Sequence, residues 1–149
     1  MLTGKKIVLG VSGGIAAYKM ATVASMLSKL HADIHVVMTE NATHFITPET
    51  FEVLTGNHCY TDTFDRCMEL HVPHIALGTQ ADAILIAPAS ADVVGKIANG
   101  IADDMLTTCV LPATCPVMLA PSMNVHMYEN PIVQDNMKKL VSYGYEIIE

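Results

Sequence analysis

The chain has 149 residues, of which 51% are hydrophobic and 15% charged, a composition typical of one globular domain with a sizeable core. Fifteen acidic residues outnumber eight basic ones, so the net charge of −7 argues against nucleic-acid or anionic membrane partners. The four cysteines form no CxxC pair, which argues against a disulfide framework and indicates reduced thiols in a cytoplasmic protein. No apolar stretch approaches the roughly 20 residues that a membrane span requires.

The first half of the chain alternates strands and helices. Residues 7–11 form an apolar run that ends in glycines and predicts a strand, and apolar residues recur with helical spacing over 16–30. Residues 34–38 predict a second buried strand. Residues 47–56 begin with Thr-Pro, an N-cap and a first-turn proline, and end in glycine, which predicts a short helix.

The second half continues this alternation with three strands and three helices. The strands are predicted at residues 83–87, 117–120 and 145–148. The helices are predicted at residues 92–99, 103–110 and 130–144, the second with Asp103 as its N-cap. Continuous apolar strands alternating with helices indicate the α/β class, with a doubly wound, Rossmann-like parallel sheet that has helices on both faces.

A glycine-rich turn follows the first predicted strand, in the run Gly10-Val-Ser-Gly-Gly-Ile-Ala-Ala-Tyr-Lys19. Because it leads into a helix, its backbone N–H groups are available to an anion such as a phosphate. Its spacing fits neither the GxGxxG dinucleotide fingerprint nor a Walker A loop. A phosphate site and a bare tight turn both remain open.

Two more strand ends carry small or polar residues. Thr39 follows the second strand and has a hydroxyl that can donate to a phosphate or to a sugar-like hydroxyl. The run Ala87-Pro-Ala-Ser-Ala-Asp92 joins the third strand to a helix, and its small residues permit close approach of a flat ring. Asp92 is either a ligand contact or only a helix N-cap.

Residues 70–78, Leu-His-Val-Pro-His-Ile-Ala-Leu-Gly, are interpreted as a fourth polar loop. His71 and His74 are three residues apart, but no Cys or carboxylate stands at a metal-ligand spacing, so we expect no metal. His74 is a candidate general base near neutral pH, and a structural histidine is the alternative.

Asn124 stands after the apolar strand that stops at Pro121, where ligands bind in open α/β sheets. An Asn holds a carboxylate through its amide, whereas Lys or Arg would over-stabilise the ground state of a carboxylate that must leave as CO2. The residue therefore points to decarboxylation. The alternative is that Asn124 caps a helix or turn. Met123 and Met127 are candidates for a pocket wall.

The glycine-rich turn, His74-Ile75, Ala87-Pro-Ala-Ser-Ala-Asp92 and Pro121-Ser-Met-Asn124 occur in the order found in the flavin-containing cysteine decarboxylases, and the chain resembles that family over its whole length. The likeness is greatest to the members that decarboxylate 4'-phosphopantothenoylcysteine to 4'-phosphopantetheine in coenzyme A biosynthesis. The combination of the histidine motif with Pro-x-Met-Asn is specific, whereas the glycine-rich turn alone is not.

The resemblance implies an FMN site with its phosphate near Ser12, Gly13, Gly14 and Thr39, and with Ser90, Ala91 and Asp92 near the cofactor. It implies that His74 is the catalytic base, that Asn124 binds the substrate carboxylate and that Met123 lies beside the substrate. Family members are typically trimers, or multiples of trimers, with sites between subunits, so we expect a homotrimer or a higher multiple.

Three departures from the family pattern qualify these expectations. The family commonly has Asn where this chain has Asp92, and many members have Trp where it has Tyr128. Phosphopantothenoylcysteine decarboxylases also have a substrate clamp with a catalytic cysteine after Pro-x-Met-Asn, and no cysteine follows Asn124 here. We therefore expect residues 1–149 to form a single FMN-binding decarboxylase domain without the clamp.

Two alternatives stay open within the same superfamily. One is a peptidyl-cysteine decarboxylase that acts on the C-terminus of a precursor peptide. The other is a non-catalytic flavoprotein regulatory subunit like the phosphatase-inhibiting relatives, although those have extra acidic segments that this chain lacks.

Overall fold

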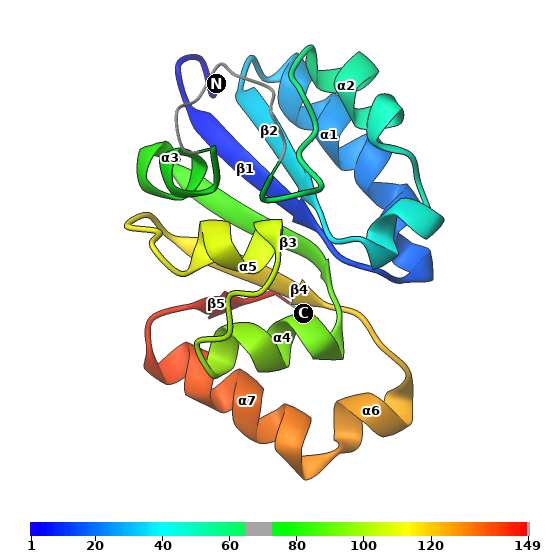
Figure 1. Cartoon of the computed structure of the whole chain (residues 1–149), viewed down its shortest axis with the longest axis vertical. Helices are drawn as coiled ribbons and strands as arrows, with labels where there is room; N and C mark the ends of the chain where they lie inside the picture. Colours follow the sequence, from blue (N-terminus) through cyan, green and yellow to red (C-terminus); the bar gives the residue numbers. More distant parts are fainter. Residues whose placement is uncertain (65–72, 149) are drawn as a thin grey trace.

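A computed structural model describes residues 1–64 and 73–148 of the chain. These residues form a five-stranded parallel sheet with the strand order β2-β1-β3-β4-β5 (Figure 1). The strands are β1 (Lys6–Val11), β2 (Asp33–Met38), β3 (Ala83–Ala89), β4 (Val117–Pro121) and β5 (Glu146–Ile147). The doubly wound parallel sheet expected from the sequence is confirmed.

Helical segments connect successive strands. Before β3 these are η1 (Ile15–Lys19), α1 (Met20–Lys29), η2 (Asn41–His44), α2 (Pro48–Thr55) and α3 (Pro73–Gln80). After β3 they are α4 (Ala91–Ala98), α5 (Met105–Val110), α6 (Val125–Glu129) and α7 (Pro131–Ser142). Within residues 1–64 and 73–148, no helix is both long and apolar enough to cross a membrane.

Two hydrophobic clusters cover the two faces of the sheet. Neighbouring residues of β1 divide between them: Val8 belongs to the cluster that packs under α4, α5 and α7, and Leu9 to the one under α1 and α2. Side chains alternate across a strand, so this division places helices on both faces. All of β1 from Val8 to Val11 is buried, which is why the strand reads as a continuous apolar run.

The predicted helix boundaries hold where local capping chemistry determines them. Thr47 accepts a hydrogen bond from the backbone N–H of Thr50, and Gly56 ends α2 with a φ of 74°, in the left-handed region that favours glycine. Asn130 accepts from the N–H of Ile132 and begins α7. Each of these helices begins or ends at a residue that satisfies a backbone N–H or C=O group left without a partner inside the helix.

The structure differs from the predicted elements in three places. Residues 73–78, interpreted as part of the loop 70–78, belong to helix α3, because Pro73 occupies its first turn and Leu77 packs into the core. The region 16–30 begins with the 3-10 segment η1 before α1 starts at Met20. Helix α6 was not predicted, because it is only five residues long and buries none of them.

Candidate functional site

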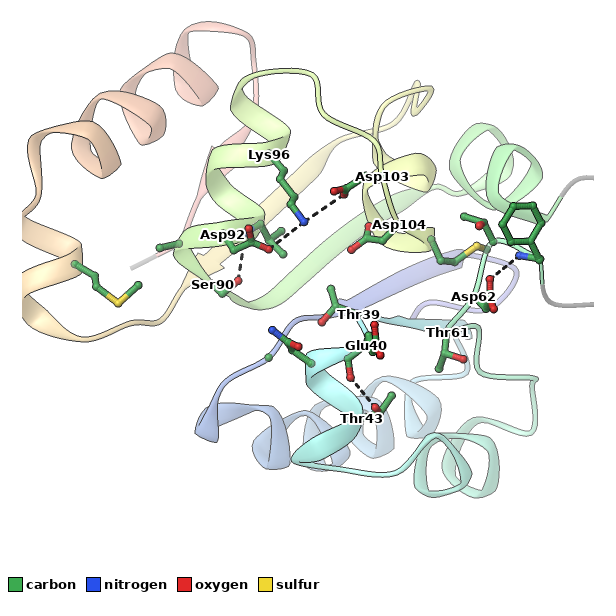
Figure 2. Close-up of a pocket in the computed structure, with 18 residues that line it drawn as sticks. Thr39, Glu40, Thr43, Thr61, Asp62, Ser90, Asp92, Lys96, Asp103 and Asp104 are labelled. Carbon is green, nitrogen blue, oxygen red and sulfur yellow. Dashed lines mark hydrogen bonds and ion pairs between the residues drawn. The ribbon is translucent and has the colours of Figure 1, made fainter.

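A cavity of about 890 Å³ opens at the carboxyl ends of the strands. The strand order reverses between β1 and β3, and in open α/β sheets ligands bind at this switch point. Figure 2 shows Thr39, Glu40 and Thr43 on one wall, with Ser90, Asp92, Lys96, Asp103 and Asp104 on the facing wall. The cavity therefore lies between the loops that follow β1 and β2 and the segment that includes α4 and the start of α5.

The loops after β1 and β3 are joined behind this cavity by Ser12. Ser12 is fully buried, and its hydroxyl donates to the carbonyl oxygen of Pro88 and accepts from the backbone N–H of Ser90 at 2.9 Å. It does not line the cavity, whereas Gly13 does. The structure thus shows Ser12 fixing the distance between two loops, and the predicted cofactor contacts of Ser12 and Gly14 stay predictions.

Gly13 and Thr39 bring the first two loops together. A Cβ atom on Gly13 would stand 2.5 Å from Cβ of Asn41, so a larger residue there would push η2 away. Thr39 is nearly buried at the cavity wall, and its hydroxyl accepts from the N–H of Ala42 at 3.2 Å. The close packing sets the position of the wall formed by Glu40, Asn41 and Thr43.

Ser90, and not Asp92, is the N-cap of α4. The Ser90 hydroxyl accepts from the N–H of Val93 at 3.3 Å, and Asp92 lies in the first turn of the helix. The cap interpretation of Asp92 was therefore wrong. Ser90, Ala91 and Asp92 all line the cavity, as expected of residues near a ligand.

A lysine that sequence reasoning did not single out also lines the cavity. Nζ of Lys96 lies 3.3 Å from Oδ2 of Asp92 and 3.2 Å from Oδ1 of Asp103. The spacing of four residues between Asp92 and Lys96 on a predicted helix was the available signal. Asp103 was predicted as the N-cap of α5, but Asp104 has that place and forms a capping box with Thr107.

The Asn124 side chain caps α6, since its Oδ1 accepts from the N–H of His126 at 2.8 Å. Asn124 is exposed and does not line the cavity, although Met127, one turn later, does. Met123 is partly buried between β4 and α6. The capping alternative is confirmed, and the amide nitrogen of Asn124 has no hydrogen bond among the described residues.

His74 lies in the first turn of α3, and its role as a general base stays a prediction. His71 lies outside the described residues. Figure 1 places α3 and α6 on opposite sides of the molecule, so the structure does not bring the segments that carry His74 and Asn124 together within one chain.

Residues 61–64 also line the cavity, and no sequence pattern indicated them. They are positioned by the preceding Tyr60, which extends the sheet at the outer edge of β2: Tyr60 N–H donates to Val36 and its carbonyl oxygen accepts from Met38. Both bonds use backbone atoms, so side-chain types do not reveal them.

Burial makes Cys109 a poor nucleophile. Desolvation, with a smaller contribution from the negative charge of Asp104, raises the pKa of the Cys109 thiol to about 12. Desolvation also raises the pKa of Cys115. Neither residue lines the cavity, and a protonated thiol is a weak nucleophile.

The sheet order and the cavity at its switch point define an α/β protein of the flavodoxin-like doubly wound class, with a candidate ligand site at the β1/β3 reversal. The model of the family described as Flavoprotein matches residues 1–149. The chain belongs to the Flavoprotein family.

Curated relatives match the chain along its length. It is 49% identical over 149 residues to the coenzyme A biosynthesis bifunctional protein CoaBC of Bacillus subtilis (strain 168), covering 100% of this chain and 37% of that protein. It is 44% identical over 144 residues to CoaBC of Vibrio cholerae, covering 97% of this chain and 36% of that protein. The chain thus spans little more than a third of the length of these relatives.

Solved structures also match almost the whole chain. The FMN-dependent cysteine decarboxylase SpaF is 38% identical with a TM-score of 0.93, covering 100% of this chain and 86% of that one. A PPC decarboxylase mutant complexed with pantothenoylaminoethenethiol is 30% identical with a TM-score of 0.83, covering 97% and 81%. The peptidyl-cysteine decarboxylase EpiD is 26% identical with a TM-score of 0.86, covering 100% and 88%.

Proposed function

We propose that the chain is an FMN-dependent cysteine decarboxylase that converts 4'-phosphopantothenoylcysteine to 4'-phosphopantetheine in coenzyme A biosynthesis, in the cytoplasm. The observation that carries the proposal is the cavity at the β1/β3 switch point, lined by the loops that the family resemblance assigns to the cofactor. The likeness to CoaBC proteins over the whole chain supports the choice of substrate.

The residues at the cavity fit FMN. Its volume of about 890 Å³ lies in the range of cofactor pockets, roughly 300–1,000 Å³. Gly13, Thr39 and Asn41 supply backbone and side-chain donors suited to the phosphate, and carboxylates such as Glu40 suit the hydroxyls of a ribityl chain. Bound FMN supplies a two-electron acceptor, which a cysteine needs because loss of CO2 otherwise leaves a carbanion without an electron sink.

Asn124 is suited to hold the substrate carboxylate because the hydrogen bond by which it caps α6 uses only the oxygen of its side-chain amide. Oδ1 accepts from His126, which fixes the side chain and leaves both N–H donors of Nδ2 for an anion. The capping and substrate-binding roles are therefore compatible. Met123, the preceding residue, would supply an apolar contact beside the substrate.

His74 would act as the general base that takes the proton from the thiol side of the substrate. Since α3 and α6 lie on opposite sides of one chain, a site that uses both His74 and Asn124 requires a second copy. Exposed apolar side chains near the carboxyl edge provide a surface for that copy, among them Ile15 (76% exposed) and Ile132 (70% exposed). We propose a homotrimer, or a multiple of it, with sites between subunits.

We propose that residues 1–149 form one domain that provides the cofactor site and the carboxylate-binding turn. The final protonation of the product needs an acid, and Cys109 and Cys115 are unsuited to it because burial raises their pKa. A substrate clamp with a cysteine, as the family resemblance implies, would have to come from outside these residues.

The product released from synthetic phosphopantothenoylcysteine tests the proposal. We expect the purified protein to bind FMN, to turn yellow, and to release CO2 from this substrate under anaerobic conditions. For residues 1–149 tested by themselves, we expect a product two hydrogens short of phosphopantetheine and one bleached flavin per site. A colourless protein that fails to bind added FMN, or one that leaves the substrate intact, would contradict the proposal.

Peptidyl-cysteine decarboxylation is the second candidate, because the peptidyl-cysteine decarboxylase EpiD matches the chain over its whole length. Competition between phosphopantothenoylcysteine and a peptide with a C-terminal cysteine separates the two functions. We expect the small substrate to be consumed and the peptide to be left intact. Lack of turnover with both would favour the regulatory-subunit alternative.

A further inference from the structure

Lys96 is held between two carboxylates at the cavity wall. Its ammonium joins Asp92, four residues earlier on α4, to Asp103, which lies just before the capping box of α5 (Figure 2). The Lys96 side chain is only 25% exposed. Two partners on different segments fix the position of the ammonium, whereas a surface lysine with one partner would remain mobile.

The ammonium keeps its charge in this position. Desolvation lowers the pKa of Lys96, but the bonds to Asp103 and Asp92 outweigh that effect and raise the pKa above its ordinary value. The amine is therefore protonated throughout the physiological range.

Lys96 is also the one cationic residue among the described residues that line the cavity. Five carboxylates line the same space: Glu40, Asp62, Asp92, Asp103 and Asp104. An ammonium has three N–H donors, and two bonds to carboxylates leave one donor for a ligand. An anionic group in this cavity therefore has one side-chain cation to meet, and that cation is fixed before the ligand arrives.

We propose that Lys96 tunes the flavin, by stabilising the negative charge that the isoalloxazine ring gains when it is reduced. This inference rests on the proposed function. Two electrons and one proton pass from the substrate carbon beside the sulfur to the ring, and the C–S bond of the thiolate becomes a C=S bond. The ring gains one negative charge unless it takes a second proton, and a fixed cation favours that charged form.

The flavin phosphate is the competing partner for Lys96. Gly13 and Thr39, which the family resemblance assigns to the phosphate, belong to the β1 and β2 loops, and Lys96 lies on the facing wall beside Ser90 and Asp92 (Figure 2). This arrangement favours the isoalloxazine ring over the phosphate as the partner of Lys96. The two partners differ in an observable way, because riboflavin has the ring and lacks the phosphate.

Reductive titration of the FMN-loaded protein without substrate tests the proposal. We expect Lys96→Met to shift the flavin midpoint potential to more negative values and Lys96→Arg to restore most of the shift. Lys138→Met, an exposed change on α7, is the control and should leave the potential unchanged. The ratio of FMN to riboflavin affinity should be the same in all variants.

A double variant separates the ammonium from the summed charge of its cluster. Lys96→Met with Asp103→Asn removes one charge of each sign, so the net charge is kept, and we still expect the potential to fall. Asp103→Asn alone removes one competing carboxylate, keeps Lys96 paired with Asp92, and should raise the potential even if Lys96→Met does not fold.

Unchanged potentials in the Lys96 variants would overturn the proposal. So would a loss of the FMN preference over riboflavin without a change in potential, which would place Lys96 at the phosphate. A chain that binds flavin and shows these shifts but leaves phosphopantothenoylcysteine intact would refute the proposed function and keep the role of Lys96. A chain that binds no flavin would refute both.

Discussion

The two ends of the candidate site differ in how completely one chain builds them. Around β1 and β3, Ser12 is fully buried and joins the Pro88 carbonyl to the Ser90 N–H. At α6, by contrast, no residue of the helix is buried, and Asn124 itself is exposed. The chain fixes the proposed cofactor loops by internal packing, whereas the turn proposed to bind the substrate carboxylate has little of this support.

The difference indicates that one chain builds the proposed cofactor end of the site, whereas a second copy of the chain completes the proposed substrate end. A rigid wall at the switch point suits a cofactor that stays bound through each turnover. An exposed turn far from α3 suits a site that a second copy completes.

His74→Asn should have the largest effect, because it removes the proposed general base. We expect turnover of phosphopantothenoylcysteine to fall about 10²- to 10⁴-fold, as is typical when proton transfer is lost. FMN affinity should not change. Steady-state kinetics and flavin titration measure the two effects, and turnover equal to that of the parent would exclude the role.

Asn124→Asp should cost about 2–3 kcal/mol in substrate binding, because an amide donor becomes a carboxylate that repels the substrate. The helix should survive, since Asp is as good an N-cap as Asn. Isothermal titration with a non-reactive substrate analogue gives the affinity, and circular dichroism checks the fold.

Mixed assemblies of these two variants test whether sites lie between subunits. Co-expressed chains with His74→Asn and Asn124→Asp, isolated through two different tags, should recover part of the activity that each variant lacks alone. We expect this recovery of activity because some sites in a mixed assembly then combine an intact His74 from one copy with an intact Asn124 from another. Mixed assemblies as inactive as the separate variants would place both residues in one chain's own site.

Ser12→Ala should destabilise the proposed cofactor end by about 1–3 kcal/mol, because the partly buried Ser90 N–H loses its acceptor. We also expect weaker FMN binding, since Ser90 begins α4 at the cavity. Urea unfolding and flavin titration measure the two effects. Ser28→Ala on α1 is the control: it removes a partly buried hydroxyl bond far from the cavity and should leave FMN affinity unchanged.

Asp33→Asn should have the smallest effect, which is present near neutral pH and disappears in acid. Desolvation raises the pKa of Asp33, but hydrogen bonds from His35 and Asn57 outweigh it and lower the pKa below 3.8. Ionised Asp33 therefore stabilises the fold above that pH, and the contribution is lost as the pH falls through the lowered pKa.

Urea midpoints of the parent and Asp33→Asn between pH 5 and pH 2 measure this contribution. We expect the difference between them to shrink as the pH falls. Asp135→Asn, an exposed change on α7, is the control. A difference that stays constant over this range would show that the ionisation of Asp33 does not contribute.

The sequence by itself determined the sheet and most helix ends. Buried parallel strands read as continuous apolar runs, and Thr47, Gly56 and Asn130 mark helix ends through their own backbone chemistry. The sequence did not determine which of two adjacent polar residues takes a given role, such as the N-cap of a helix. Asp103 and Asp104 have the same side chain, and only the backbone path decides which one reaches Thr107 and which one pairs with Lys96.

The tertiary structure alone decided which side chains share the cavity. Residues 61–64 reach it through backbone pairing with β2, and Lys96 reaches it because α4 packs beside the segment before α5. It also decided that α3 and α6 lie apart within one chain. Apolar periodicity reports which face of an element is buried, but the distance between two distant elements depends on how the whole sheet twists and packs.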